Sequence, residues 1–309
     1  MSVTELIKKA IVDTAVLRND ASIATARDMI PHMRTILKDE KYPKKYIENV
    51  QYAKSPAAVM DIYFPDNMSD KCPVFVEVHG GAWYFGQKSS IEFMPFLYGL
   101  ERGYICVSLD YTLAPDCVYP QSVVEIMQAI DFLKKNSDKY NIDPDRIALW
   151  GGSAGAHMAA LAAYSAGSGY LKEESLGADS KVNVLVLWYG CHNYYLGKRL
   201  DEWIYHNFFG SEDLSKVRDK LLLSNPAVHI TDKAPYTYLQ HGLIDGVVPY
   251  EQSVYMYNAL KIIAGEEKCQ LELLENCDHA DVKMFAPDNV KKMFDYIDSK
   301  ISLGDGNGY

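Results

Sequence analysis

The sequence has few cysteines and no long apolar run, and both shortages narrow the class of protein. Six of its 309 residues are cysteine, and no two are spaced as a CxxC pair or a metal-ligand set. We therefore expect reduced thiols, no bound metal and a cytoplasmic protein. No apolar run approaches the roughly 20 residues that span a bilayer. The opening stretch MSVTELIKKAIVDTAVL lacks the continuous apolar core of a signal peptide.

Positive charge is also in short supply. The 31 lysines and arginines are outnumbered by 41 aspartates and glutamates, so the formal net charge is −10, and no basic run stands out. An acidic surface repels phosphate backbones and anionic headgroups, so we expect neither nucleic acid nor a membrane as a partner. A small molecule is the partner class that remains. The oligomeric state stays open, and a homo-oligomer is compatible with the sequence.

Most of the sequence alternates between strand-like and helical patterns. The strand-like runs are VMDIYF, PVFVEVHGG, YICVSLD, RIALW, VNVLVLWYG, YTYLQHG and CQLELLE. VNVLVLWYG is apolar almost throughout, as in parallel strands that are buried on both faces. The pattern predicts a single α/β domain over residues 1–309, with a mostly parallel sheet and helices on both faces. Residues 1–48 are predicted as an N-terminal helical segment, and residues 191–228 as a helical insertion that caps the sheet.

One serine lies in a glycine-rich turn where a strand-like run gives way to an alanine-rich helix. The residues Gly151-Gly152-Ser153-Ala154-Gly155 match the G-x-S-x-G nucleophile elbow in its strand–turn–helix context. A side chain at the apex of such a turn requires a strained backbone, and bulkier neighbours two positions away on either side would collide. The pattern therefore predicts Ser153 as a catalytic nucleophile.

A serine nucleophile needs a base, and the base needs an orienting carboxylate. On a sheet of this kind the partners follow in the order serine, acid, histidine. Asp245 follows the run YTYLQHG, and His279 follows the run CQLELLE and is the only histidine beyond Asp245. These positions predict Asp245 as the acid and His279 as the base. Asp278 and Asp281 are poorer candidates for the acid because they flank the histidine in sequence.

The segment VHGGAWYFG predicts the remaining part of the site. Glycines allow a close backbone approach, so the amides of Gly81 and Ala82, with that of Ala154, are predicted to form an oxyanion hole. Trp83 and Tyr84 are predicted to contact the substrate. The chemistry requires neither a metal nor an organic cofactor.

Four segments in order along the chain resemble one family. His79-Gly80-Gly81-Ala82-Trp83, YTLAP at residues 111–115, NIDPDRIALWGGSAGAH and HGLIDGVVPYEQS are similar to the α/β-hydrolase esterases of the hormone-sensitive-lipase-like group. The similarity is greatest to bacterial acetyl and feruloyl carboxylesterases, and it covers roughly residues 55 to 300. The resemblance implies the α/β-hydrolase fold and the same catalytic residues. Two departures are Ala82, where the family usually has a third glycine, and Thr112, where it has an arginine that forms an ion pair.

The sequence thus predicts a serine carboxylesterase that hydrolyses small, short-acyl esters through a Ser-His-Asp triad and an acyl-enzyme intermediate. Two alternatives use the same fold. One is an amidohydrolase with the same triad, such as a kynurenine-formamidase-like enzyme or a small peptidase. The other is a non-catalytic binding protein, which the presence of all three triad residues disfavours. The natural substrate is not encoded in any motif, because fold does not set specificity.

Overall fold

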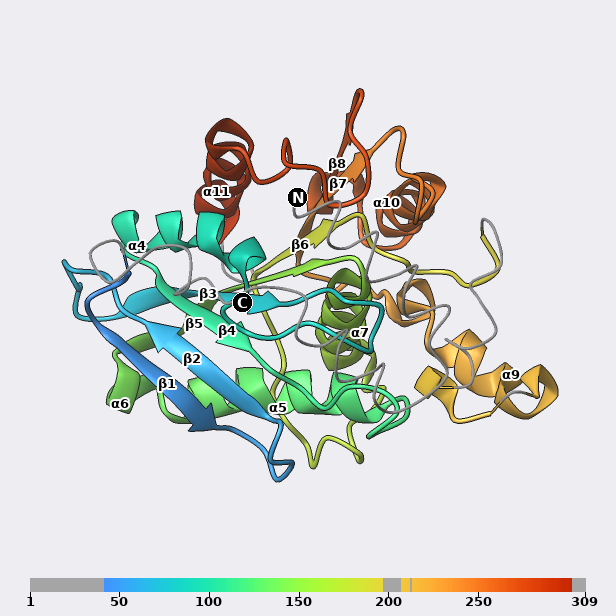
Figure 1. Ribbon diagram of the computed structural model, residues 1–309, viewed down its shortest axis with the longest axis horizontal. Coiled ribbons are helices and arrows are strands. Elements are labelled where there is room, and N and C mark those ends of the chain that lie inside the picture. Colours follow the sequence, from blue (N-terminus) through green and yellow to red (C-terminus); the bar gives the residue numbers. More distant parts are fainter. Residues whose placement is uncertain (1–41, 197–206, 212, 302–309) are drawn as a thin grey trace.

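An eight-stranded sheet forms the centre of the protein (Figure 1). The computed structural model describes residues 42–196, 207–211 and 213–301. The strands are β1 (Tyr46–Gln51), β2 (Val59–Tyr63), β3 (Cys72–Val78), β4 (Ile105–Leu109), β5 (Ile142–Gly152), β6 (Val184–Trp188), β7 (Tyr236–Gly242) and β8 (Cys269–Leu274). Their order in the sheet is β1-β2-β4-β3-β5-β6-β7-β8. Strand β2 pairs antiparallel with both β1 and β4, and all other pairs are parallel. The predicted mostly parallel sheet is confirmed.

Helices cover both faces of this sheet, also as predicted (Figure 1). One buried cluster packs α5 (Gln121–Lys135), α7 (Ala154–Ser168) and α10 (Glu251–Ile263) against one face. A second cluster packs the 3₁₀ helix η1 (Ile91–Leu97) and α11 (Pro287–Ile301) against the other face. Short elements complete the set: α4 (Tyr98–Glu101), α6 (Ser137–Tyr140), α9 (Leu214–Leu223), η2 (Pro226–His229) and η3 (Glu266–Lys268).

The burial of individual elements follows from their residue patterns. All five residues of β6, VLVLW, are buried, because a central parallel strand has helices on both sides. In α5, the apolar residues at helical spacing are at most 2% exposed and form one stripe: Val123, Ile126, Met127, Ile130 and Leu133. Because β3, β5, β7 and β8 are parallel, the loops that follow them emerge at the same edge of the sheet. These four loops carry the residues singled out in the sequence.

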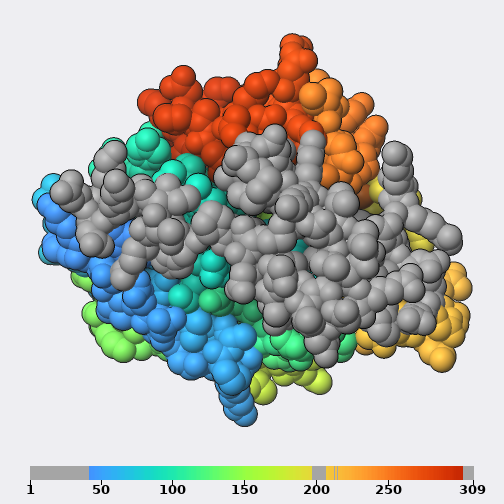
Figure 2. Space-filling view, viewed as in Figure 1, coloured from blue at the N-terminus to red at the C-terminus, as the bar shows by residue number. Residues whose placement is uncertain are grey.

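The space-filling view shows β1 and β2 in blue along one edge of the molecule and the α10–α11 region in orange and red along another (Figure 2). The helices expected within the first forty residues lie outside the described residues. Of the expected insertion at 191–228, residues 191–196, 207–211 and 213–228 are described and include α9 and η2. The division into domains stays a prediction.

Two further expectations concern the cysteines and the membrane. All six cysteines are free thiols, and five of them are buried. None of the described helices is long and apolar enough to cross a lipid bilayer.

Candidate active site

Ser153 lies at a sharp turn between the end of β5 and the start of α7. Its backbone has φ 55° and ψ −122°, a strained region for a residue with a side chain. The glycines on either side are required by space: a Cβ at Gly151 would lie 2.4 Å from the backbone of Gly155. A Cβ at Gly155 would lie 2.1 Å from the carbonyl oxygen of Val78 in the neighbouring strand. The elbow geometry expected from the glycine spacing is therefore present.

His279, in the loop after β8, lies between Ser153 and Asp245. Its Nε2 is 3.0 Å from Ser153 Oγ, and its Nδ1 is 2.8 Å from Asp245 Oδ2. A carboxylate only accepts hydrogen bonds, so Nδ1 carries the proton, and Nε2 is left to accept the serine hydroxyl. The imidazole is almost completely buried, and Tyr189 packs edge-on against it with ring centroids 4.8 Å apart. The ring is thus oriented in the tautomer that a general base requires.

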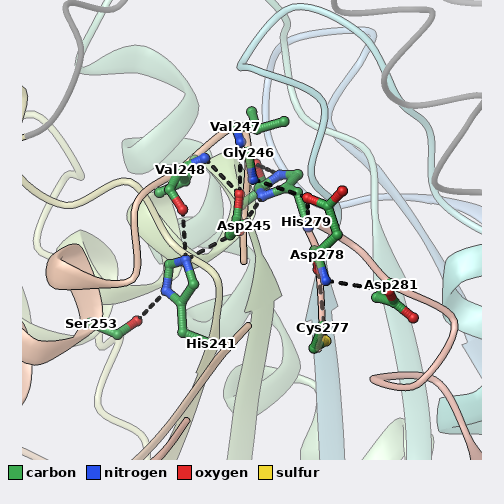
Figure 3. Close-up of polar contacts among 11 residues, drawn as sticks. His241, Asp245, Gly246, Val247, Val248, Ser253, Cys277, Asp278, His279 and Asp281 are labelled. Carbon is green, nitrogen blue, oxygen red and sulfur yellow. Dashed lines mark hydrogen bonds and ion pairs between the residues drawn. The ribbon is translucent and has the colours of Figure 1, made fainter. Parts of the chain in front are cut away.

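Asp245, in the loop after β7, accepts hydrogen bonds at both of its oxygens (Figure 3). Oδ1 accepts from the amides of Val247 and Val248 at 2.9 and 2.8 Å. Oδ2 accepts from His279 and also lies 3.2 Å from Nε2 of a second imidazole, that of His241. Burial by itself would raise the pKa of Asp245, but the two histidines outweigh it and hold the pKa well below its ordinary value. The carboxylate is therefore charged at neutral pH.

His241 is fixed by contacts on both ring nitrogens. Nδ1 lies 2.7 Å from Ser253 Oγ, and Nε2 lies 2.9 Å from the carbonyl oxygen of Val248 (Figure 3). A carbonyl oxygen only accepts, so Nε2–H donates, shared between Val248 and Asp245. No motif in the sequence indicates the contact between His241 and Asp245, because only the turn after β7 brings the two side chains together.

Asp278 holds the acid loop and the histidine loop together. Its Oδ1 accepts from the amide of Gly246 at 3.0 Å and from that of His279 at 2.7 Å. Its own amide donates to Asp281 Oδ2 at 3.3 Å (Figure 3). The imidazole Nδ1 itself lies against the carboxylate of Asp245.

The loop after β3 faces Ser153 across a narrow cavity. Gly81 has φ 119°, and a Cβ there would lie 2.0 Å from the carbonyl oxygen of Phe85, so only glycine fits. Ala82 also has a positive φ of 50°. Within the described part of the chain, the amides of Gly81 and Ala82 have no hydrogen-bond acceptor. Both residues line a cavity of about 20 Å³ together with Ser153 and His279. Ala154 begins α7, so its amide has no intrahelical acceptor either.

His79 and Tyr111 support this loop from below. The two rings stack with centroids 4.4 Å apart, and the Tyr111 hydroxyl donates to the carbonyl oxygen of His79 at 2.7 Å. His79 Nδ1 lies 2.7 Å from the carbonyl oxygen of Gly80. Burial lowers the pKa of His79 to about 4, so the ring is neutral at pH 7. His79 acts as a brace for the loop and does not reach Ser153 among the contacts found.

The two aromatic residues predicted to contact the substrate follow the glycines of this loop. Trp83 and Tyr84 are each 2% exposed, and neither lines the cavity at Ser153, whereas Phe85 does. The Trp83 indole donates to Nδ1 of the buried His157 at 3.1 Å and stacks on Phe208 with centroids 5.0 Å apart. A buried indole N–H needs an acceptor, and that acceptor turns the ring into the core and away from the cavity.

Thr112 stands where the related family has an arginine, and the nearby carboxylate of Glu125 is hydrogen-bonded by other donors. Glu125 accepts from the Thr112 amide at 2.7 Å, from the Thr112 hydroxyl at 2.9 Å and from Gln121 Nε2 at 3.0 Å. No cation pairs with Glu125 among the described residues. Neutral donors therefore satisfy the carboxylate of Glu125.

One acidic residue of the cavity carries no sequence motif. Glu92, in the first turn of η1, lines the cavity with Ser153 and is 8% exposed. Burial raises the pKa of Glu92 to about 7, and the charge of His279 opposes part of this rise. Within the described ranges, no group of His, Cys, Asp or Glu side chains is arranged to hold a metal ion.

Comparisons with known proteins show which family the chain resembles. A family profile described as BD-FAE matches residues 60–260. Esterase LipQ of Mycobacterium tuberculosis is 32% identical over 68% of this chain and 50% of its own length. Isoprenylcysteine alpha-carbonyl methylesterase ICME of Arabidopsis thaliana is 30% identical over 86% of this chain and 64% of its own length. The chain thus spans about half to two thirds of the length of these curated relatives.

Solved structures share the fold. Esterase B of Lactobacillus rhamnosis, inhibited by a tributyrin phosphonate, superposes with a TM-score of 0.72 at 20% identity, covering 98% of this chain and 97% of that one. The butyrate-bound esterase Est2 of Thermogutta terrifontis superposes with a TM-score of 0.66 at 20% identity, covering 88% of this chain and all of the other. Because the family profile matches well over half of the sequence, the chain belongs to the BD-FAE family of α/β-hydrolase carboxylesterases.

Proposed function

We propose that this protein hydrolyses small carboxylic esters with short acyl groups, through a covalent acyl-enzyme intermediate on Ser153. The observation that carries the proposal is the continuous hydrogen-bonded chain from Ser153 through His279 to Asp245, with distances of 3.0 and 2.8 Å. Membership of an esterase family and curated relatives named as esterases support the reaction class. The narrow cavity beside Ser153 supports a short acyl group.

The first half of the reaction forms the acyl-enzyme. Ser153 Oγ attacks the ester carbonyl carbon while His279 Nε2 takes the hydroxyl proton. The carbonyl oxygen becomes an oxyanion, and we assign its stabilisation to the amides of Gly81, Ala82 and Ala154. Each such donor contributes about 2.7–4 kcal/mol to the transition state. The bond to the alcohol oxygen then breaks, and that oxygen takes the proton from Nε2.

The second half regenerates the serine. Water donates a proton to His279 Nε2 and attacks the acyl carbon, and the acid leaves as Ser153 recovers its proton. During both halves His279 becomes an imidazolium, and the charged carboxylate of Asp245 stabilises it. The strained turn at Ser153 places this residue in the lining of the cavity.

Replacing Ser153 with alanine tests the proposal. We expect kcat for 4-nitrophenyl acetate to fall by about 10⁴- to 10⁶-fold, because the nucleophile is lost and only the oxyanion site and binding remain. A fluorophosphonate probe is expected to label the wild type at Ser153, as located by mass spectrometry, and to leave the variant unlabelled. The matched control is Ser168→Ala at the exposed end of α7, which should keep full activity.

Substrate class is measured in the same series. Acyl chains from acetyl to decanoyl, acetylated and feruloylated sugars, and a prenylcysteine methyl ester form the ester arm. N-formyl-kynurenine and peptide anilides form the amide arm. A higher kcat/KM for an amide than for every ester would overturn the proposed reaction class, and full activity of Ser153→Ala would overturn the proposed nucleophile.

A further inference from the structure

Glu92 is a carboxylic acid in the reaction cavity for which the proposed mechanism has no use. It lines the same cavity as Ser153 and His279, together with the oxyanion-loop residues Gly81 and Ala82. Its residue surface is 92% buried. Among the described residues, no hydrogen-bond donor and no cation is paired with its carboxylate. A buried ionised carboxylate without a partner is costly, so this arrangement is stable only if the group is neutral or finds its partner elsewhere.

His279 lines the same cavity, and its charge, when present, lowers the pKa of Glu92. With a proton on Nδ1 alone the imidazole is neutral before the reaction, so it does not pair with Glu92 at that stage. Lysine and arginine are absent from the lining of the cavity in the described part of the chain. The nearest lysine in the loop, Lys88, pairs with Asp61 at 2.9 Å. The charge of Glu92 contributes to raising the pKa of the neighbouring Glu77, whose shift arises mainly from burial. The electrostatic environment thus favours a positive group at this position.

The size of the cavity limits what that positive group is. The cavity also has to hold the carbonyl oxygen of the ester beside Gly81 and Ala82, so it leaves room for only a small positive group. An ammonium group is of that size, whereas a guanidinium or a quaternary ammonium group is larger. Because Ser153 and Glu92 line the same narrow cavity, an ammonium that pairs with Glu92 belongs to the acyl part of the ester, close to the reacting carbonyl carbon.

We propose that Glu92 is a substrate-binding residue that pairs with an ammonium group on the acyl part of the ester, so that small amino-acid esters are preferred substrates. This inference rests on the proposed esterase function. Without a cation beside it, an ionised Glu92 repels the negative charge that develops on the carbonyl oxygen and so destabilises the transition state. A substrate ammonium removes that opposition and pairs the buried carboxylate in the same step. The pKa of Glu92, about 7, suits a carboxyl group that ionises when a cation binds beside it.

Three ethyl esters of nearly equal size test this assignment. Ethyl propionate, ethyl glycolate and glycine ethyl ester carry a methyl, a hydroxyl and an ammonium at the same position. In Glu92→Gln we expect kcat/KM for glycine ethyl ester to fall about 10- to 100-fold, the range for a lost hydrogen bond to a charged group. For ethyl propionate we expect a change of less than about threefold. Glu101→Gln, an exposed glutamate on α4, is the matched control and should leave all three values unchanged.

The outcomes separate the two proposals. Equal losses for glycine ethyl ester and ethyl glycolate would overturn charge pairing, since a hydroxyl would then serve as well as an ammonium. Equal effects of Glu92→Gln on all three esters would overturn any binding role for this residue while leaving the esterase reaction standing. Failure of the wild type to hydrolyse any of the three would overturn the proposed function itself.

A measurement on the wild type alone covers the case in which Glu92→Gln does not fold. The ratio of kcat/KM for glycine ethyl ester to that for ethyl propionate is divided by the ratio of their rate constants with hydroxide. This correction removes the intrinsic reactivity of the glycine ester. A corrected preference above about tenfold supports the assignment, and any smaller preference refutes it.

Discussion

Replacing Asp245 with asparagine changes one oxygen of the side chain to an amino group and keeps its shape. In the wild type, Oδ1 accepts two main-chain amides at 2.8 and 2.9 Å, and Oδ2 accepts from His279 at 2.8 Å. The two amides can be satisfied only by the remaining oxygen of asparagine. The new amino group must then face Nδ1 of His279, which is also a donor in the wild type.

Two donors cannot share a hydrogen bond, so the imidazole must change its tautomer. With the proton on Nε2, the ring donates toward Ser153 Oγ and has no lone pair there to accept the hydroxyl proton. His241 does not force the same change, because its Nε2–H keeps the Val248 carbonyl as an acceptor. We therefore expect kcat to fall about 10⁴-fold, or ~5.5 kcal/mol in activation free energy, as for the corresponding change in a serine protease.

The assay is the rate of 4-nitrophenyl acetate hydrolysis by purified Asp245→Asn, with its thermal unfolding recorded to show that the variant is folded. Asp281→Asn is the control, because it makes the same chemical change in the histidine loop without touching the imidazole. The tautomer reasoning is refuted if Asp245→Asn keeps kcat within about tenfold of the wild type. It is refuted equally if Asp281→Asn loses as much activity as Asp245→Asn.

Two further predictions concern stability. Gly155→Ala places a Cβ 2.1 Å from the carbonyl oxygen of Val78, so α7 and β3 must separate. We expect the free energy of unfolding, measured by heat or urea, to fall by about 1–3 kcal/mol, as in overpacked cores. Unchanged stability of this variant would contradict the close packing of the elbow. Burial raises the pKa of Glu77 well above its ordinary value of 4.5, so the folded state holds this proton more tightly than the unfolded state. Stability therefore falls as pH rises above about 4.5, and Glu77→Gln should gain in free energy of unfolding relative to the wild type between pH 5 and pH 8. A constant difference between the two proteins over that range would argue against a buried neutral acid.

The glycine turns and the buried faces of the strands and helices could be predicted from the sequence, because each depends on local backbone geometry or burial. Gly151, Gly155 and Gly81 are glycines because a Cβ at each would overlap neighbouring backbone, and such a requirement leaves a fixed spacing in the chain. The apolar pattern of β6 and of α5 likewise follows from burial on two faces or on one stripe. The loops that follow parallel strands all lie at the same edge of the sheet. The order of strands along the chain therefore already indicated that Asp245 and His279 would lie near Ser153. Their catalytic roles stay predictions until the variants are measured.

Only the tertiary structure decided which side chains enter the cavity and which turn away from it. The buried indole of Trp83 donates to His157, 74 positions along the chain, a contact that no motif in the sequence indicates. Glu92 has no recognisable spacing to Ser153, yet η1 packs so that its carboxyl group lines the same cavity. His241 reaches Asp245 only through the turn after β7. A sequence records the conformations and burial that each segment needs by itself, whereas contacts between distant segments depend on how the elements pack, and packing leaves no periodic signal in the chain.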